Sequence, residues 1–270
     1  MSILITPIVV TPLMKVPLLL ATATYSYYGM TPPTQPPAKE EMERMSKTEN
    51  TPITAPILAG VKVSCSPYSV LRQSHGLHIQ YGLCSLAVAE AAAILVHAFP
   101  SYAASILLHA LGRGGRGSSP LPPPSVRGAA SAASLAASLL AAAGGLTRVW
   151  CHRTLGASFT WQLAVRDGHQ LVTGGPYALA RHPSYTGWAL IALGNVLYLF
   201  GPGSYFARTA VGRSAAGRWG ARALAVHMTA VSVALCGRAG KEDRMMREEF
   251  GEEWGRWARR TPYRLVPWVY

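Results

Sequence analysis

An uninterrupted apolar run that begins directly after an Arg-His-Pro triplet constrains this chain more than any other feature. Residues 185–200 are almost wholly apolar, and Pro183 suits the first position of a helix because it lacks an N–H and has a fixed φ. Pro183 also pushes His182 towards an extended conformation, so His182 is the predicted N-cap. The run therefore predicts a membrane-spanning helix whose positive dipole end, with its unpaired first-turn amides, lies at the membrane surface and attracts anions.

The composition extends this prediction to the whole chain. Half of the residues are hydrophobic and only 14% are charged, which is low for a soluble protein of this length and typical of a polytopic membrane protein. The net charge of +13 comes mostly from arginines spread between apolar runs, which favours an anionic membrane surface as the partner and disfavours nucleic acid. The four cysteines are widely spaced and no His stands beside them at metal-ligand spacing, so we expect free thiols and no metal site.

We therefore expect an all-α, polytopic integral membrane protein with about five spans and a C-terminal amphipathic interfacial helix. The first span is weak because prolines and Lys15 interrupt it, and the last is short for a full crossing. The predicted spans are residues 3–20, 79–99, 129–146, 183–200 and 223–236. Residues 241–260 repeat aromatic and apolar positions every three to four residues with charges between them, as in a helix that lies at the interface.

Three charged features qualify this arrangement. Glu90 falls inside a predicted span; an intramembrane carboxylate is a functional candidate by default, but we expect a cavity-facing or protonated structural glutamate. Arginines 148, 153, 166 and 181 share one polar segment, which places the candidate site on the cytosolic side. If residues 183–236 form a hairpin, arginines 208, 213, 218 and 222 lie on the far side, against the positive-inside rule.

Glycines open one face of the central helix. Gly187 and Gly194 are two turns apart, so that face permits close approach by another helix or by a ligand.

A second motif near the C-terminus completes the pattern. Arg238 precedes Glu242 by one turn where the last span ends, and Phe250-Gly251-Glu252-Glu253-Trp254 follows. Together with the Arg-His-Pro-x-Tyr-x-Gly motif at 181–187, this resembles the isoprenylcysteine carboxyl methyltransferase family over roughly residues 148–270. Two motifs in family order are more specific than either alone. We therefore divide the chain into N-terminal spans and loops (1–146) and a methyltransferase-like cofactor-binding membrane region (147–270) within one integrated domain.

The resemblance implies S-adenosylmethionine as cofactor and methylation of the C-terminal carboxylate of prenylcysteine proteins (CaaX-type substrates) in the endoplasmic reticulum membrane. A carboxylate is already ionised at neutral pH, so positioning and desolvation supply most of the acceleration. A guanidinium, Arg238 or Arg181, would hold the carboxylate, and Glu242 would accept hydrogen bonds from the cofactor. The cofactor site implied by the family motifs comprises Tyr177, His182, Pro183, Tyr185, Glu242 and Glu253.

Two other enzyme classes and one non-enzymatic class remain open. The C-terminal residues 263–270 and the Arg-His-Pro motif are also similar to membrane sterol reductases, which use NADPH. Those reductases usually carry more spans before the shared region than 145 residues hold. A phospholipid or other small-molecule methyltransferase is a further alternative, and a non-catalytic membrane scaffold is the last.

Overall fold

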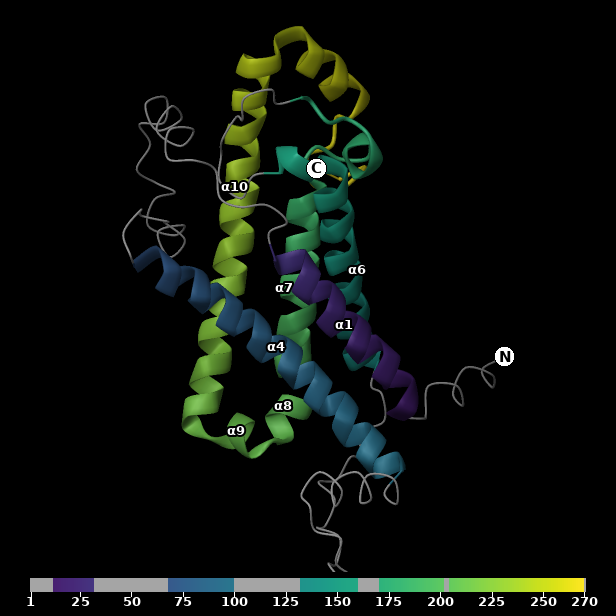
Figure 1. The fold of residues 1–270 in the computed structure, drawn as a ribbon, viewed down its shortest axis with the longest axis vertical. Helices are drawn as coiled ribbons and strands as arrows, with labels where there is room; N and C mark the ends of the chain where they lie inside the picture. Colours follow the sequence, from purple (N-terminus) through teal and green to yellow (C-terminus); the bar gives the residue numbers. More distant parts are fainter. Residues whose placement is uncertain (1–11, 32–67, 100–131, 160–169, 202–203, 270) are drawn as a thin grey trace, which may run out of the picture.

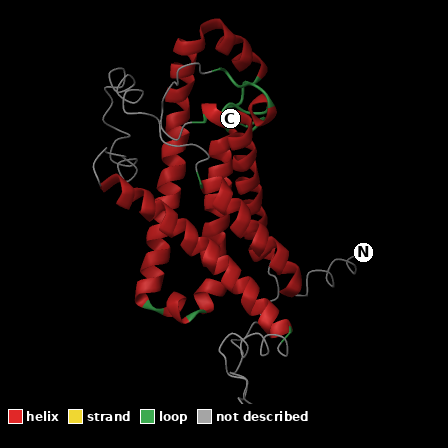
Figure 2. Cartoon of the chain, in the orientation of Figure 1, coloured by secondary structure: helices red, strands yellow, loops and turns green. Residues whose placement is uncertain are grey.

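The computed structural model describes residues 12–31, 68–99, 132–159, 170–201 and 204–269, and these residues form helices and connecting loops with no strand among them (Figure 2). The longer helices are α1 (Lys15–Met30), α4 (Tyr68–Ala98), α6 (Ala132–Leu155), α7 (Pro183–Phe200) and α10 (Ala215–Arg260). The short helices are α8 (Tyr205–Arg208) and α9 (Ala210–Arg213), with 3-10 turns η1 (Pro12–Met14), η2 (Gly156–Ser158) and η3 (Gly175–Ala178). The all-α class expected from the sequence is confirmed for this part of the chain.

In the part of the chain that the structure describes, three segments are long and apolar enough to cross a membrane, namely Ala132–Leu155, Pro183–Arg208 and Ala215–Arg260. Residues Gly82–Val96 within α4 form a shorter apolar helix. The predicted count of five spans is therefore not confirmed. The first predicted span, residues 3–20, overlaps α1, which begins at Lys15 and continues to Met30. Pro17 is tolerated there because it lies in the first helical turn, and residues 3–11 lie outside the described part of the chain.

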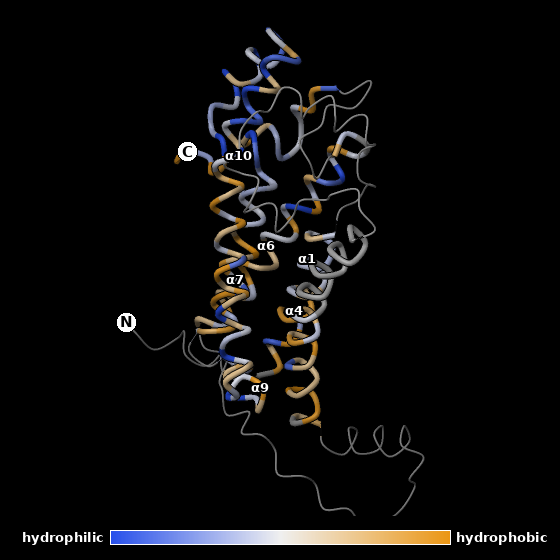
Figure 3. The backbone as a smooth tube through the Cα atoms, turned by 90° about the vertical axis from the view of Figure 1, so that its left-hand side faces the viewer, coloured by the Kyte–Doolittle hydropathy of each residue, from blue (hydrophilic) through white to orange (hydrophobic). Residues whose placement is uncertain are grey.

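Helices α6, α7 and α10 run along the long axis of the molecule, and α1 and α4 cross them obliquely (Figure 1). Apolar residues line the lengths of these helices, whereas hydrophilic residues gather at the end that holds the last turns of α10 (Figure 3). That end also holds the start of α7 and the C-terminal residues, so both sequence motifs reach one end of the bundle.

Glycine backbones bring α6 and α7 into direct contact. A Cβ atom at Gly194 would lie 2.6 Å from the carbonyl oxygen of Ala137, and one at Gly187 would lie 2.8 Å from that of Gly144. Real Cβ atoms do not approach backbone so closely, so only glycine fits at these crossing points. Of the two occupants expected for the open face of α7, the structure places a helix there.

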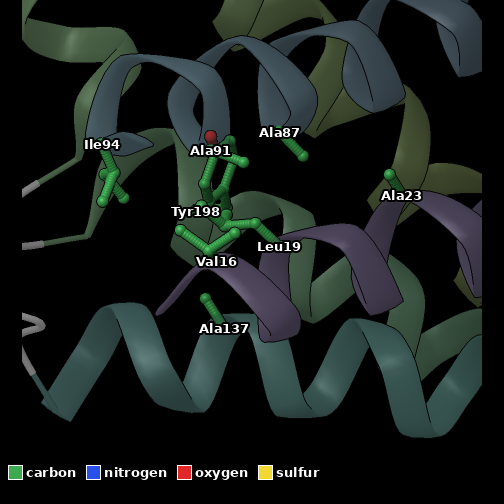
Figure 4. Packing of buried hydrophobic residues seen from close by; sticks show 8 residues of the cluster. All are labelled: Val16, Leu19, Ala23, Ala87, Ala91, Ile94, Ala137 and Tyr198. Carbon is green, nitrogen blue, oxygen red and sulfur yellow. The ribbon is translucent and has the colours of Figure 1, made fainter. Parts of the chain in front are cut away.

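A buried ion pair joins the N-terminal helices to α7. Lys15 Nζ of α1 donates to Glu90 Oε1 of α4, and Tyr198 Oη of α7 donates to Glu90 Oε2 at 2.5 Å. Tyr198 also belongs to a cluster of buried apolar residues from α1, α4 and α6 (Figure 4), which includes Val16, Leu19, Ala87, Ala91, Ile94 and Ala137. Glu90 is therefore a buried structural residue with partners on two other helices, and Lys15, which looked like an interruption of an apolar run, supplies the opposite charge.

The C-terminal helix departs from the predicted boundary. α10 continues without a break through Lys241 and changes direction at Gly251, whose φ of 50° and ψ of −119° are not helical. A non-glycine residue rarely adopts this φ. The segment expected to lie at the interface is thus two pieces: residues 241–250 prolong the spanning helix, and residues 252–260 turn away from it. Within the second piece, Arg256 Nη1 lies 3.8 Å from Glu252 Oε2 on the surface, one helical turn apart.

Candidate functional site

The site is built where the chain enters α7. Pro183 is the first residue of the helix and His182 is its N-cap, with a φ of −125°, as the sequence predicts. The C-terminal residues lie along this junction: the amides of Arg181 and His182 donate to the carbonyls of Tyr263 (2.9 Å) and Arg264 (2.7 Å). The start of α7 is therefore joined to a segment about 80 residues later in the chain, which no local pattern indicated.

His182 is held between two carboxylates of α10. Its Nε2 lies 3.0 Å from Asp243 Oδ1, and its Nδ1 lies 3.5 Å from Glu242 Oε2. Burial by itself lowers the pKa of His182, but the hydrogen bonds and charges of the two carboxylates outweigh it and raise the pKa to about 9. The imidazole is therefore a doubly protonated cation at neutral pH, and both of its N–H groups donate.

Asp243 is the central acceptor of the site. Arg181 donates to it twice, from Nε at 3.2 Å and from Nη2 at 3.1 Å, and Arg264 Nε donates at 3.0 Å. With the bond from His182, three cationic side chains converge on one carboxylate that is only 5% exposed. Asp243 is not among the site residues expected from the sequence. Its position directly after Glu242 is the signal that could have indicated it.

Glu242 has one occupied and one open oxygen. Its Oε2 accepts from Tyr185 Oη at 2.5 Å and faces His182, whereas Oε1 has no hydrogen-bond partner within the described part of the chain. The side chain is 24% exposed. Arg238, one turn earlier on α10, acts electrostatically on both Glu242 and Tyr185. The arrangement fixes the carboxylate and leaves one oxygen able to accept hydrogen bonds from a ligand.

The guanidinium of Arg181 donates its hydrogen bonds to other groups of the protein. Besides its two bonds to Asp243, its Nη1 donates to the carbonyls of Thr261 (3.0 Å) and Pro262 (2.9 Å). Its guanidinium also lies over the ring of Trp254, 5.9 Å from the ring centroid. Of the two arginines expected to hold a substrate carboxylate, Arg181 thus has its donors occupied by the fold, and its observed role is structural.

The predicted aromatic residues line the site on different sides. Tyr185 stacks on His182 with a ring-centroid distance of 5.4 Å and an interplanar angle of 8°. Tyr177 lies deeper, in a cluster with Cys151, Trp254 and Trp257, and its carbonyl accepts from Trp257 Nε1 at 3.1 Å. Burial raises the pKa of the Tyr177 phenol, so it stays neutral.

The structure brings together most of the predicted site residues, and one lies apart. Arg181, His182, Tyr185, Arg238 and Glu242 form a contiguous cluster, and Pro183 is buried beside it as the first residue of α7. Glu253 lies beyond the bend at Gly251 and is exposed. No group of three metal-ligating side chains occurs among the residues described.

Cationic side chains are prominent in the cluster. Among the described residues, Arg181, His182, Arg238 and Arg264 lie around two carboxylates, Glu242 and Asp243. Such a site can hold an anionic group of a ligand by charge-assisted hydrogen bonds. The open oxygen of Glu242 in turn favours a ligand that also presents N–H or O–H donors.

Comparison with known proteins supports the resemblance stated from the motifs. Residues 136–211 match the model of the isoprenylcysteine carboxyl methyltransferase family, a stretch that includes the Arg-His-Pro motif. The chain is also 28% identical over 110 residues to a delta(14)-sterol reductase of Methylotuvimicrobium alcaliphilum, and that alignment covers 40% of this chain and 21% of the reductase. The chain thus matches about a fifth of that relative's length. No solved structure matches the chain.

Proposed function

We propose that this protein is a membrane methyltransferase that uses S-adenosylmethionine to esterify the C-terminal carboxylate of prenylcysteine substrates. The family match over residues 136–211 supports a methyltransferase. The observation that carries the proposal is the position of Arg238 and Glu242 beside His182, because it joins the second motif to the first in one polar cluster.

The residues present fit such a cofactor. Its amino-acid portion carries a carboxylate and an ammonium group, and its ribose carries hydroxyls. The cationic side chains around His182 suit the carboxylate, and the open oxygen of Glu242 suits the ammonium group or a hydroxyl. Tyr185 and His182 hold Glu242 in place by donating to its other oxygen. When bound, the cofactor supplies an electrophilic methyl group.

The protein's own contribution is then to position and desolvate the acceptor carboxylate. The carboxylate is ionised at neutral pH, so no general base is needed. Arg238, only 9% exposed, would hold the carboxylate by charge-assisted hydrogen bonds that are stronger in a partly dry site. Fixing both reactants in one geometry accounts for most of the acceleration that such a site can give. Tyr177 and Pro183 would support the cofactor side of the site.

The proposed setting is the endoplasmic reticulum membrane with the site facing the cytosol. A lipid-linked acceptor explains why the cluster lies at the end of helices long and apolar enough to span a bilayer. Arg153 in the last turn of α6 and Arg259 in the last turn of α10 are both exposed and would then be accessible from the same, cytosolic side. Labelling of single cysteines at these two positions in sealed microsomes tests this, and labelling from opposite sides would contradict the hairpin of α7 and α10.

The decisive experiment is a calorimetric titration of the detergent-purified chain with S-adenosylhomocysteine and, separately, with NADPH. Binding of S-adenosylhomocysteine alone supports a methyltransferase, whereas binding of NADPH alone would overturn it in favour of the reductase alternative. Transfer of a labelled methyl group to N-acetyl-farnesylcysteine should then yield a base-labile ester. Transfer only to an amine or to a phospholipid headgroup would keep the cofactor and overturn the acceptor.

A further inference from the structure

The end of the molecule opposite the candidate site is formed by a compact turn between α7 and α10. Residues 204–222, which we call the arginine turn, contain α8, α9 and the first two turns of α10 (Figure 1). Four arginines are exposed within it, at positions 208, 213, 218 and 222. The sequence from 168 to 241 contains no Asp or Glu, so every charged side chain of the turn is cationic.

The arginine turn has a defined conformation. Three hydroxyls cap its successive helices: Ser204 accepts from the amide of Ala207, Thr209 from that of Gly212, and Ser214 from that of Gly217. The backbone is also close-packed, since a Cβ atom at Gly212 would lie 2.0 Å from the carbonyl oxygen of Phe206. The arginines are therefore presented from a fixed scaffold, which lowers the entropic cost of binding through them.

Exposed apolar side chains accompany the charges. Trp219 is 68% exposed and Val211 is 65% exposed, and the Arg222 guanidinium lies 5.1 Å from the centroid of the Trp219 ring. Tryptophan is enriched at the boundary between hydrocarbon and headgroups, where arginine side chains extend towards phosphates. Indole and guanidinium side by side are thus suited to an interface with a polar anionic layer.

The distance along α10 from the arginine turn to the candidate site is close to the thickness of a bilayer. No charged residue of the Asp, Glu, Lys or Arg type occurs between Arg222 and Arg238. These two residues are 16 positions apart on one helix, which at ~1.5 Å per residue is about 24 Å. This length is close to the ~30 Å hydrocarbon core of a bilayer. With Arg238 at the candidate site, Arg222 and the arginine turn reach the opposite membrane surface.

We propose that the arginine turn is a docking surface for anionic phospholipid headgroups in the leaflet opposite the candidate site. All charged side chains of the turn are cationic, and the exposed Trp219 and Val211 suit the boundary between headgroups and hydrocarbon. This combination favours an anionic lipid surface over an acidic protein. The inference does not depend on the reaction catalysed at the other end.

The test uses the full chain reconstituted into vesicles of phosphatidylcholine with or without phosphatidylglycerol. Quenching of Trp219 fluorescence by brominated phosphatidylglycerol is compared with quenching by brominated phosphatidylcholine, and the Trp219→Phe variant isolates the signal of this one indole. We expect several-fold stronger quenching by the anionic lipid. Equal quenching by both lipids would overturn the proposal.

The charge variant is Arg213→Gln/Arg218→Gln, which leaves the Arg222–Trp219 pair intact. Its matched control, Arg259→Gln/Arg260→Gln, removes two exposed arginines from the other end of the molecule. One arginine near an anionic surface contributes about fivefold in binding, so the preference for phosphatidylglycerol should fall threefold or more in the first variant and stay unchanged in the control. An unchanged preference in the first variant, or an equal loss in both, would overturn the assignment.

Two further arms keep the proposal testable if the charge variant fails to reconstitute. Raising the salt to about 1 M shortens the Debye length to about 3 Å and should abolish the preference in the wild-type chain. Inorganic phosphate at matched ionic strength should do no more than chloride. A specific effect of phosphate would indicate a small-anion site in place of a lipid surface, and persistence of the preference at high salt would exclude a charge-based surface.

Discussion

Asp243 Oδ1 lies 3.0 Å from His182 Nε2. This contact joins α10, in the third turn before its bend at Gly251, to the N-cap residue of α7. The same carboxylate accepts from Arg181 and Arg264, so the two helices and the C-terminal segment meet at one acidic side chain. Stability and ligand binding at this end of the molecule should therefore depend on the same few charges.

The first prediction concerns pH. The pKa of His182 is raised to about 9 in the folded protein, above its unfolded value near 6.5. The contribution of His182 to the free energy of unfolding is therefore fully present below about pH 6.5 and is lost as the pH rises through about 9. The shift in pKa corresponds to roughly 3 kcal/mol. The melting temperature of the detergent-purified chain should fall between pH 7 and 9.5. In His182→Gln it should be lower at pH 7 and nearly flat over that range, and a parallel fall in both proteins would contradict the assignment.

The second prediction concerns Asp243. Asp243→Asn keeps the shape but removes the charge that compensates three cations, and breaking a buried charge cluster in this way costs about 3–5 kcal/mol. The variant should melt at a markedly lower temperature and should lose most of the fall in stability between pH 7 and 9.5, because His182 no longer has its principal partner. Glu253→Gln is the matched control: the residue is exposed and away from the cluster, so its melting curve should coincide with that of the wild type.

The third prediction concerns Glu242. Glu242→Gln can still accept from Tyr185 and His182 through its amide oxygen, so the fold should persist. The open position then carries an amide in place of a carboxylate oxygen, and loss of a charge-assisted hydrogen bond costs roughly 1.5–3 kcal/mol. The affinity for S-adenosylhomocysteine should fall by about one to two decades. The melting temperature should fall as well, because Glu242 is one of the two carboxylates that stabilise protonated His182, so the affinity is measured at a temperature at which both proteins are folded. An affinity within about threefold of wild type, roughly 0.7 kcal/mol, would remove Glu242 from the cofactor site.

Local chemistry predicted the start and end of α7 from sequence, because Pro183 suits the first position of a helix and Pro202 disfavours a helical conformation at Gly201. The same local signals could not reveal that Lys15 and Glu90, 75 residues apart, neutralise each other. Each looked like a defect in an apolar run. A single sequence shows which charges are costly in a membrane but not which of them pair.

The candidate site was predictable to a similar extent. Both motifs were visible, and the one-turn spacing of Arg238 and Glu242 placed them on one face of a helix. The role of Arg181 was not visible, because its partners at Thr261 and Pro262 belong to a segment without regular structure. The bend at Gly251 was also missed, since an isolated glycine in an amphipathic pattern is compatible with a continuous helix.

The fourth prediction concerns the contact between α6 and α7. Gly194→Val would place side-chain atoms against the backbone of Ala137 and Ala141, at 2.6 Å for the Cβ atom alone. The helices would have to separate, at a cost of about 1–3 kcal/mol or more. Gly220→Ala on α10 is the control, because a Cβ atom there meets nothing within 4 Å; it should raise stability by up to about 1 kcal/mol. A stable Gly194→Val protein would refute the close packing of the two helices.

The last prediction concerns the buried ion pair between α1 and α4. Lys15 and Glu90 are 5% and 3% exposed, so removing one charge leaves the other without compensation in an apolar setting. Lys15→Met and Glu90→Gln should each destabilise the protein by about 3–5 kcal/mol. The double variant should recover most of this loss, because two neutral side chains avoid the desolvation of both ions, and Tyr198 Oη can still donate to the amide oxygen at position 90. A double-mutant cycle on melting temperatures measures the coupling. Additive losses would mean that the two side chains do not interact, and α1 would then be held to α4 by apolar packing alone.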